Sequence, residues 1–303
     1  MQPADVSVTP RSFPEARGLL QLLKPITWFP PMWAFLCGAV SSGVSLGDNL
    51  QLLLAGVLLT GPLVCGGSQI VNDWFDRHVD AINEPHRPIP SGRVPGSWGL
   101  YYAVLWSVLG LCFSALLGTW VMLATLVGLA LAWAYSAPPL RLKSNGWYGN
   151  AAVGISYEGL AWVTGAAVML GGVMPSYQIL LLALLYSLGA HGIMTLNDFK
   201  AIEGDLRIGI RSLPAQLGAD RAARVACWVM AVPQLVVVCL LWFWGLPVAA
   251  LGVTASLVLQ LLAMRKMLRD PLGLAPWYNG TGVTLYVLGM MLCAFALRGV
   301  AVG

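Results

Sequence analysis

The sequence predicts an all-α, polytopic membrane protein with nine transmembrane helices. Hydrophobic residues make up 58% of the chain and charged residues only 10%, whereas about 25% charged is usual in soluble domains. Apolar runs close to the ~20 residues that a helix needs to cross a bilayer recur along the whole chain. The ten-residue alternation that is typical of an outer-membrane barrel is not seen in these runs, so each is expected to be helical.

The nine expected spans are delimited by the polarity and length of the connections between them. In chain order they are 24–43, 51–73, 98–117, 119–136, 149–170, 177–197, 222–244, 246–264 and 280–299. Very short connections, such as Gly118-Thr119 and 171–176, join some neighbouring spans. The two long connections, 74–97 and 198–221, are polar and begin as extensions of a membrane helix.

The basic residues predict the orientation of the spans. When the connections are assigned to alternate sides, 16 of the 17 Lys and Arg residues fall on one side and only Arg298 falls on the other. By the positive-inside rule that side is cytoplasmic, which places there the N-terminus, its tail 1–23, and the long loops 74–97 and 198–221. The net charge of +4 is therefore a topology signal and predicts no nucleic-acid partner.

Carboxylates are rare in this chain, yet they are concentrated in the two long loops. These segments hold 7 of the 13 Asp and Glu residues, and carboxylates near a membrane are costly unless they are paired or bind a cation. On a helix, Asp73, Asp76 and Asp80 lie within about 60° of one another, and Asn72 widens this arc to about 100°. The first loop therefore presents several oxygen ligands in one direction.

A second polar segment begins 125 residues later, at Asn197-Asp198, and ends at Asp205. Asp198 and Asp205 are expected to share a helix face with Asn197 alongside. Ala201 takes the position that the middle carboxylate has in the first segment, and Glu203 points away if the helix continues.

Oxygen ligands without a nearby Cys or His cluster favour Mg²⁺ over zinc or copper. Mg²⁺ usually takes one or two carboxylates and completes its shell with water and substrate phosphates. Two facing clusters are therefore expected to hold one diphosphate between metal ions, with basic side chains neutralising the remaining charge. The candidates for that role are Arg87, Arg141, Lys143, Lys200 and Arg211.

The two loops also share a layout. Asn72 precedes Arg87 by 15 residues, Asn197 precedes Arg211 by 14, and each arginine leads into a Pro-containing exit. A single such loop is equally well explained by solvated, salt-bridged surface charges. Repeats in membrane proteins often build a central site at their interface, and the matching pair favours that interpretation.

A third cytoplasmic element runs from Tyr135 through Pro138-Pro139 to Arg141 and Lys143. Taken alone, it is best explained as a Pro-terminated helix with positive-inside charges. Beside two acidic loops, Arg141 and Lys143 become expected phosphate contacts.

Two ionisable residues lie inside expected spans, Glu158 in the fifth and His191 in the sixth. Intramembrane ionisable groups are functional candidates by default. For His191, a hydrogen bond to a neighbouring helix is the more frequent explanation. Glu158 requires a partner even when it is uncharged, so both residues stay open between substrate contact and packing.

These signatures resemble those of the UbiA-type intramembrane prenyltransferases in order and spacing over nearly the whole chain. The resemblance rests on 72–80, which reads Asn-Asp-x-x-Asp-x-x-x-Asp, on 135–143 and on 197–205. Within that superfamily, 83–92, which reads Asn-Glu-Pro-His-Arg-Pro-Ile-Pro-Ser-Gly, is similar to the chlorophyll and bacteriochlorophyll synthase branch. Quinone and haem prenyltransferases end this loop differently.

The resemblance implies one transmembrane prenyltransferase domain over 1–303, with nine helices around a central cavity open to the cytoplasm and the bilayer. The implied reaction is Mg²⁺-dependent transfer of a geranylgeranyl or phytyl chain from its diphosphate to the propionate carboxylate of bacteriochlorophyllide. It implies an inner (cytoplasmic or intracytoplasmic) membrane, surrounding membrane lipid and an active site toward the cytoplasm. The tail preference and association with other pigment-pathway proteins stay open.

The resemblance also implies residue roles. The implied metal ligands are Asp73, Asp76, Asp80, Asp198 and Asp205. The implied diphosphate contacts are Asn72, Arg87, Arg141, Lys143, Asn197, Lys200 and Arg211. The residues implied in catalysis are Asp73, Asp76, Asp198 and Lys143. Related prenyltransferases often carry another acid where this chain has Ala201, which leaves the second ligand set, including Glu203, open.

Two alternatives remain at the level of sequence. One keeps prenyl transfer but uses a quinone-type aromatic ring as the acceptor. The other is a transporter whose acidic loops bind a cation or phosphate ester in transit. A carrier needs a midplane site reachable from both sides, whereas the polar residues here crowd on one face.

Overall fold

The computed structural model describes residues 12–299, which form a bundle of long helices joined by turns. The α-helices are α1 Ala16–Leu22, α2 Phe29–Ser41, α3 Leu50–Leu58, α4 Gly66–Asn83, α5 Trp98–Leu117, α6 Thr119–Ser136, α7 Gly146–Gly154, α8 Ala161–Met169, α9 Tyr177–Asn197, α10 Ile202–Ile208, α11 Leu213–Leu217, α12 Ala219–Phe243, α13 Pro247–Met267 and α14 Pro271–Arg298. Short helices of other types are η1 Pro25–Thr27, η2 Leu59–Cys65, η3 Leu142–Ser144, η4 Ile155–Leu160 and η5 Asp198–Ala201.

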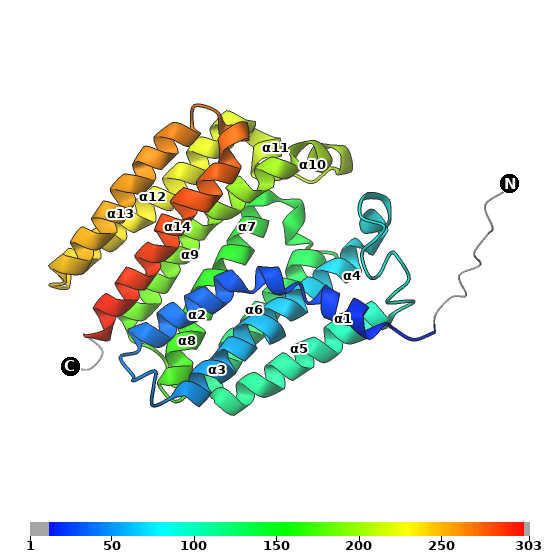
Figure 1. The fold of residues 1–303 in the computed structure, drawn as a ribbon, viewed down its shortest axis with the longest axis horizontal. Helices are drawn as coiled ribbons and strands as arrows, with labels where there is room; N and C mark the ends of the chain where they lie inside the picture. Colours follow the sequence, from blue (N-terminus) through cyan, green and yellow to red (C-terminus); the bar gives the residue numbers. More distant parts are fainter. Residues whose placement is uncertain (1–11, 300–303) are drawn as a thin grey trace.

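The helices divide the bundle into two halves (Figure 1). Helices α9, α12, α13 and α14 lie side by side in one half, and α3 to α6 in the other, with α2, α7 and α8 between them. The short helices α10 and α11 lie at one end. Within residues 12–299, eight helices are long and apolar enough to cross a membrane, and they correspond to eight of the nine predicted spans.

The first predicted span, 24–43, is not one continuous transmembrane helix. Lys24 takes a left-handed conformation with φ 43°, the 3₁₀ turn η1 follows, and α2 then has only 13 residues. Thirteen residues rise about 20 Å, which is less than the ~30 Å hydrocarbon core of a bilayer. Pro25 disfavours the α conformation at Lys24. The correction is therefore that eight, not nine, helices in the described part of the chain have spanning length.

The acidic segments begin as the sequence predicts, because the membrane helices run on into them. The π turn η2 links α3 to α4, giving one helical run over Leu50–Asn83 that carries the first acidic segment. Similarly, α9 continues through η5 and α10, a run over Tyr177–Arg207 that carries the second. The carboxylates of both segments thus lie within helical runs that continue from membrane helices.

Small residues allow α2 and α8 to pack in close contact. A Cβ atom built on Gly38 would lie 1.9 Å from the carbonyl oxygen of Trp162, and one on Gly165 would lie 2.0 Å from that of Phe35. Such glycines let helix backbones approach within a membrane bundle. This contact brings α2 against the middle of the bundle despite its short length.

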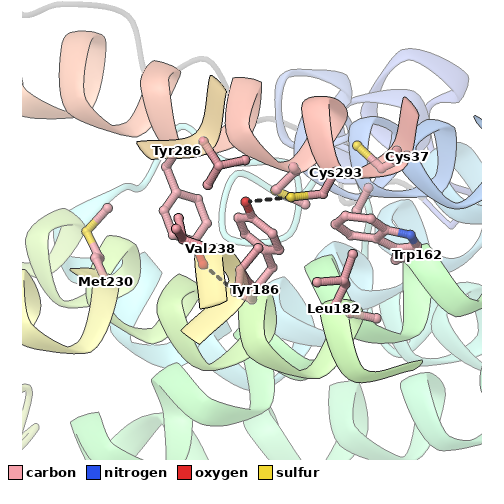
Figure 2. Packing of buried hydrophobic residues seen from close by; sticks show 14 of the residues in the cluster. Cys37, Trp162, Leu182, Tyr186, Met230, Val238, Tyr286 and Cys293 are labelled. Atoms are coloured by element: carbon pink, nitrogen blue, oxygen red, sulfur yellow. Dashed lines mark hydrogen bonds between the residues drawn. The ribbon is translucent and has the colours of Figure 1, made fainter. Parts of the chain in front are cut away.

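A buried aromatic cluster joins α2, α8, α9 and α14 (Figure 2). The Tyr286 hydroxyl donates a 2.7 Å hydrogen bond to the carbonyl oxygen of Tyr186. The Tyr186 hydroxyl lies 3.3 Å from the Cys293 sulfur, and its ring stacks on Trp162 at 5.7 Å. Because buried hydroxyl groups need partners, these bonds fix how α9 and α14 meet behind the central cavity.

Candidate active site

A cavity of about 610 Å³ lies in the centre of the bundle and is lined mainly by apolar side chains. Four polar lining residues belong to or contact the acidic segments: Asn72, Tyr135, Asn197 and Asn279. A predominantly apolar pocket with a few convergent polar groups is the usual form of a small-molecule site. The acidic segments therefore adjoin the cavity at this polar part.

The first acidic segment is the last part of α4, where three carboxylates follow one another along the helix. Asp73 and Asp80 are buried, at 2% and 7% exposure. Arg87 contacts both, with its Nη1 atom 2.9 Å from the Oδ2 atom of Asp80 and 3.6 Å from the Oδ1 atom of Asp73. This shared arginine confirms that the two carboxylates lie on one face.

Asp73 also pairs with a residue that the sequence-based site left out. The Lys24 Nζ atom lies 2.5 Å from the Asp73 Oδ1 atom, although the two residues are 49 positions apart. Lys24 was expected only as one of the topology-defining charges of the N-terminal region. Its one distinguishing signal in the sequence is its place at the start of the first predicted span, just before Pro25.

Asp76 turns toward the third motif, the element that runs from Tyr135 to Lys143. The Lys143 Nζ atom contacts both carboxylate oxygens of Asp76, at 2.5 and 2.6 Å, and the Arg141 guanidinium lies 3.4 Å away. Burial lowers the pKa of Lys143, and the negative charge of Asp76 opposes that shift. Arg141 and Lys143 thus lie at the first acidic segment, and their role as phosphate contacts stays a prediction.

Burial of the Arg87 guanidinium tends to lower its pKa, but the negative charges of Asp80 and Asp73 outweigh that effect, so the pKa of the arginine is raised.

Backbone strain marks two other cations of this group. Lys24 and Arg141 are the two non-glycine residues with positive φ in the described chain, at 43° and 36°. Such conformations persist where the surrounding structure enforces them, and they cluster at functional sites.

The second acidic segment spans η5 and α10. Asn150 of α7 donates to the Oδ2 atom of Asp198 at 3.4 Å and to the Thr195 hydroxyl at 3.2 Å. Lys200 is exposed and acts on Asp198 electrostatically. Glu203 points into solvent with its side chain 91% exposed, 3.8 Å from Arg207, as expected from a helix that continues past it.

Tyr135, at the end of α6, is the residue that the two acidic segments share. It lies near Asp198 and Asp205 of the second segment and near Asp76 of the first. Hydrogen bonds reinforce the junction: Asn72 donates to Ser136 at 3.4 Å, and Asn279 of α14 donates to Asn197 at 2.9 Å. Asn150 and Asn279 were not among the predicted site residues: Asn150 lies in the apolar span 149–170, and Asn279 lies directly before the span 280–299.

Two candidate residues lie away from the cavity. The backbone of Arg211 pairs with residues that directly follow the third motif: its carbonyl oxygen accepts a 2.8 Å bond from the Gly146 N–H, and its own N–H donates a 3.0 Å bond to the Ser144 carbonyl oxygen. The arginine side chain is exposed. Its role as a diphosphate contact stays a prediction. His191 packs beside Trp147 of α7, and its Nε2 atom lies 3.2 Å from the backbone carbonyl oxygen of Trp147. This is a contact with a neighbouring helix, which is the more frequent explanation of such a histidine.

The carboxylates fit Mg²⁺ by chemistry, although those of the first segment are placed here against cations. In the described residues, no three His, Cys, Asp or Glu side chains are grouped so that they alone hold a metal ion. The Oδ2 atom of Asp73, however, is buried without a hydrogen-bond partner. A buried oxygen with unused acceptor capacity in an oxygen-rich site suits a cation that takes few protein ligands and several substrate oxygens.

Comparison with known proteins gives a match over most of the chain. Residues 27–279 match the UbiA prenyltransferase family. The chain is 60% identical over 298 residues to the bacteriochlorophyll synthase 33 kDa chain of Cereibacter sphaeroides, covering 98% of each sequence. It is 56% identical over 304 residues to the protein of that name from Rhodobacter capsulatus, covering 100% of each.

The arrangement of the helices is also shared with a solved structure. A UbiA homologue from Archaeoglobus fulgidus, bound to DMAPP and Mg²⁺, superposes with a TM-score of 0.72 at 19% identity. The alignment covers 93% of this chain and 99% of the homologue. The fold of the described residues is therefore UbiA-like.

Proposed function

This chain belongs to the UbiA prenyltransferase family, and we propose that it is a bacteriochlorophyll synthase. It esterifies bacteriochlorophyllide with a prenyl chain taken from a prenyl diphosphate. The observation that carries this assignment is the near-full-length identity of 56–60% to the bacteriochlorophyll synthase 33 kDa chains of Cereibacter sphaeroides and Rhodobacter capsulatus. The apolar cavity bordered by two carboxylate clusters supports the same chemistry.

The acidic clusters form the diphosphate site of this proposal. Asp73, Asp76, Asp80, Asp198 and Asp205 hold Mg²⁺, the cation found with DMAPP in the archaeal homologue. When bound, Mg²⁺ supplies positive charge that neutralises the leaving diphosphate. Lys143 and Arg87 are already positioned at the carboxylates, where they add fixed positive charge beside the same group.

The cavity provides the surroundings for the reacting carbon. The allylic C–O bond breaks, its electron pair leaves with the diphosphate oxygen, and the apolar walls keep water from the resulting allylic cation. A propionate oxygen of the acceptor then forms the new C–O bond. A carboxylate is already a competent nucleophile, so the chain needs to supply orientation rather than a strong base.

The charge distribution supports a cytoplasmic active site. The acidic segments, the third motif and all but one of the basic residues lie on the side that the positive-inside rule assigns to the cytoplasm. The prenyl chain and the macrocycle are apolar and reach the cavity from the bilayer, whereas the diphosphate and propionate meet at the charged rim. The membrane of this proposal is the cytoplasmic or intracytoplasmic membrane.

The test is pigment ester formation by the purified protein. Bacteriochlorophyllide is supplied with geranylgeranyl or phytyl diphosphate, in Mg²⁺ or in EDTA, and Asp73→Ala and Asp198→Ala are run beside the wild type. We expect esterification that requires Mg²⁺ and is lost in both variants. Folded protein that binds prenyl diphosphate but forms no pigment ester would overturn the acceptor, and prenylation of a quinone-type ring would replace it.

A further inference from the structure

Two π-helical turns, η2 and η4, line the same central cavity. From η2 the lining residues include Thr60 and Cys65, and from η4 they include Tyr157 and Glu158. The Tyr157 hydroxyl ties the turns together, because it accepts hydrogen bonds from Gln69 at 3.1 Å and from the Cys65 thiol at 3.3 Å. Single π turns are rare overall, but those that occur are often found at functional sites. This wall of the cavity is thus built with a special backbone geometry.

Glu158 is the carboxyl group on this wall, and it is unpaired. Its side chain belongs to the cavity lining, the residue is 7% exposed, and no hydrogen bond or ion pair reaches it within residues 12–299. Its electrostatic neighbours are Cys37 of α2 and Tyr286 of α14, neither of which is cationic. Both belong to the buried cluster of Figure 2. The packing of the bundle therefore leaves Glu158 without a protein partner.

The position of Glu158 separates it from the diphosphate site. Asn150, which contacts Asp198, lies eight residues earlier in the same helical run. Eight helical residues rise about 12 Å. The basic side chains at the acidic clusters are already engaged there, as Lys143 is with Asp76.

The chemistry of an isolated carboxyl group in an apolar cavity limits what it does. An ionised carboxylate without a cation is costly in such a place, so Glu158 is expected to be a neutral acid. A neutral carboxylic acid has an O–H group that donates one hydrogen bond. A buried polar group without a protein partner calls for an explanation, and a ligand with an acceptor atom supplies one.

We propose that Glu158 recognises the acceptor by donating a hydrogen bond to a conjugated carbonyl oxygen on the macrocycle. This inference rests on the proposed function, in which the acceptor is bacteriochlorophyllide. The prenyl chain offers no hydrogen-bond acceptor, and the diphosphate and propionate are held at the charged rim. A ring carbonyl is the acceptor atom that the body of the macrocycle carries into the cavity. Glu158 is then a specificity residue that acts on binding and not on the transfer itself.

The test combines vibrational spectroscopy with kinetics on purified full-length protein. Resonance Raman spectra of bound bacteriochlorophyllide report each conjugated carbonyl stretch, which falls in frequency when its oxygen accepts a hydrogen bond. The variants are Glu158→Gln, which keeps a neutral donor, and Glu158→Met, which removes it at similar size. Glu203→Met is the matched control, because that side chain is 91% exposed and is not part of the cavity lining.

We expect a lowered carbonyl stretch in the wild type, in Glu158→Gln and in Glu203→Met, and a free carbonyl stretch in Glu158→Met. Glu158→Met is also expected to raise KM for bacteriochlorophyllide about tenfold, the effect of one lost hydrogen bond, with KM for the prenyl diphosphate unchanged. A wild-type protein that forms pigment ester but binds an acceptor with free carbonyls would overturn the inference and keep the proposed function. This outcome is measured on the wild-type protein alone, so it does not depend on whether a variant folds. Absence of pigment esterification by the wild type would overturn both.

Discussion

Lys24 and Asp73 form an ion pair of 2.5 Å that links the chain before α2 to the first acidic segment on α4. The carboxylate is almost fully buried, whereas the lysine side chain keeps 25% of its surface exposed. Arg87 is the second cation at Asp73, at the longer distance of 3.6 Å. Lys24 is therefore the main partner of a buried carboxylate that we assign to the metal site.

Lys24→Met is expected to destabilise the protein in the absence of substrate. The variant removes the shorter of the two ion pairs at Asp73, so the negative charge of this buried carboxylate is only partly compensated. A buried acceptor that loses its partner costs about 1–3 kcal/mol. The measurement is the midpoint of thermal unfolding in detergent. Unfolding is monitored by the labelling of buried thiols such as Cys37 and Cys293, which become reactive when the bundle opens.

The double variant Lys24→Met/Asp73→Asn separates the pair from its surroundings. Since an amide needs no counter-charge, this variant is expected to recover most of the lost stability while remaining inactive. If the double variant is as unstable as the sum of the two single variants, Lys24 acts independently of Asp73.

Lys143 is expected to contribute to catalysis through its charge. It contacts both oxygens of Asp76 and is mostly buried, with its side chain 9% exposed. Lys143→Gln removes one fixed positive group beside the leaving diphosphate, which is expected to lower kcat about 10²-fold, as for other preorganised electrostatic groups.

Lys143→Arg is the charge-conserving counterpart in this series. It is expected to retain more activity than Lys143→Gln, but less than the wild type, because the planar guanidinium does not reproduce a compact ammonium. Steady-state kinetics with saturating acceptor provide the comparison. Equal activity of the two variants would mean that the shape of the lysine, and not its charge, matters.

Asp205 and Glu203 allow the second ligand set to be tested with a matched pair. Asp205 is half-buried and lies near Tyr135 at the junction of the two acidic segments, whereas Glu203 is exposed and pairs with Arg207. Asp205→Asn is expected to raise the Mg²⁺ concentration for half-maximal activity at least about tenfold, the size of effect seen even for lost outer-shell partners. Glu203→Gln is expected to change it less than about twofold, as is usual for surface substitutions. The opposite result would place Glu203 at the metal.

Local signals in the sequence predicted much of this fold and part of the site. The helices over 98–117, 119–136 and 177–197 have the predicted boundaries, because Gly118 with φ 125° and the Gly171-Gly172 turn interrupt long apolar runs. The helical phase of Asp73 and Asp80 predicted the shared face that Arg87 contacts. Helical periodicity predicts which residues within a few turns share a face, but it does not predict contacts between distant segments.

Contacts between distant segments were not accessible to the same reasoning. The pairing of Lys24 with Asp73 depends on a turn at Pro25, where the sequence predicted an unbroken span from 24 to 43. Asn150 and Asn279 join the second acidic segment from helices that are distant in sequence. Conversely, the similar spacing of Arg87 and Arg211 predicted similar roles, but Arg211 contacts the chain just after the third motif through its backbone. Spacing fixes a register along the chain, whereas tertiary packing decides which side a side chain faces.

Gln234 and Gln260 make a pair of reciprocal amide hydrogen bonds, of 3.0 and 2.8 Å, between α12 and α13. Both side chains are completely buried. Gln234→Leu leaves the amide of Gln260 without its partner in an apolar setting, and this is expected to lower the free energy of unfolding by about 1 kcal/mol, as interhelical bonds in membranes typically do.

The double variant Gln234→Leu/Gln260→Leu removes both polar groups of this pair. It is expected to be close to the wild type in stability, because replacing both partners by apolar groups of similar size is nearly neutral. The thermal midpoints of the two single variants and the double variant, measured with the same thiol-labelling assay, form a complete cycle. Pigment esterification is expected to be unchanged in all three, because neither glutamine lines the central cavity. A double variant less stable than either single variant would show that each amide stabilises the helix pair beyond providing a hydrogen-bond partner for the other amide.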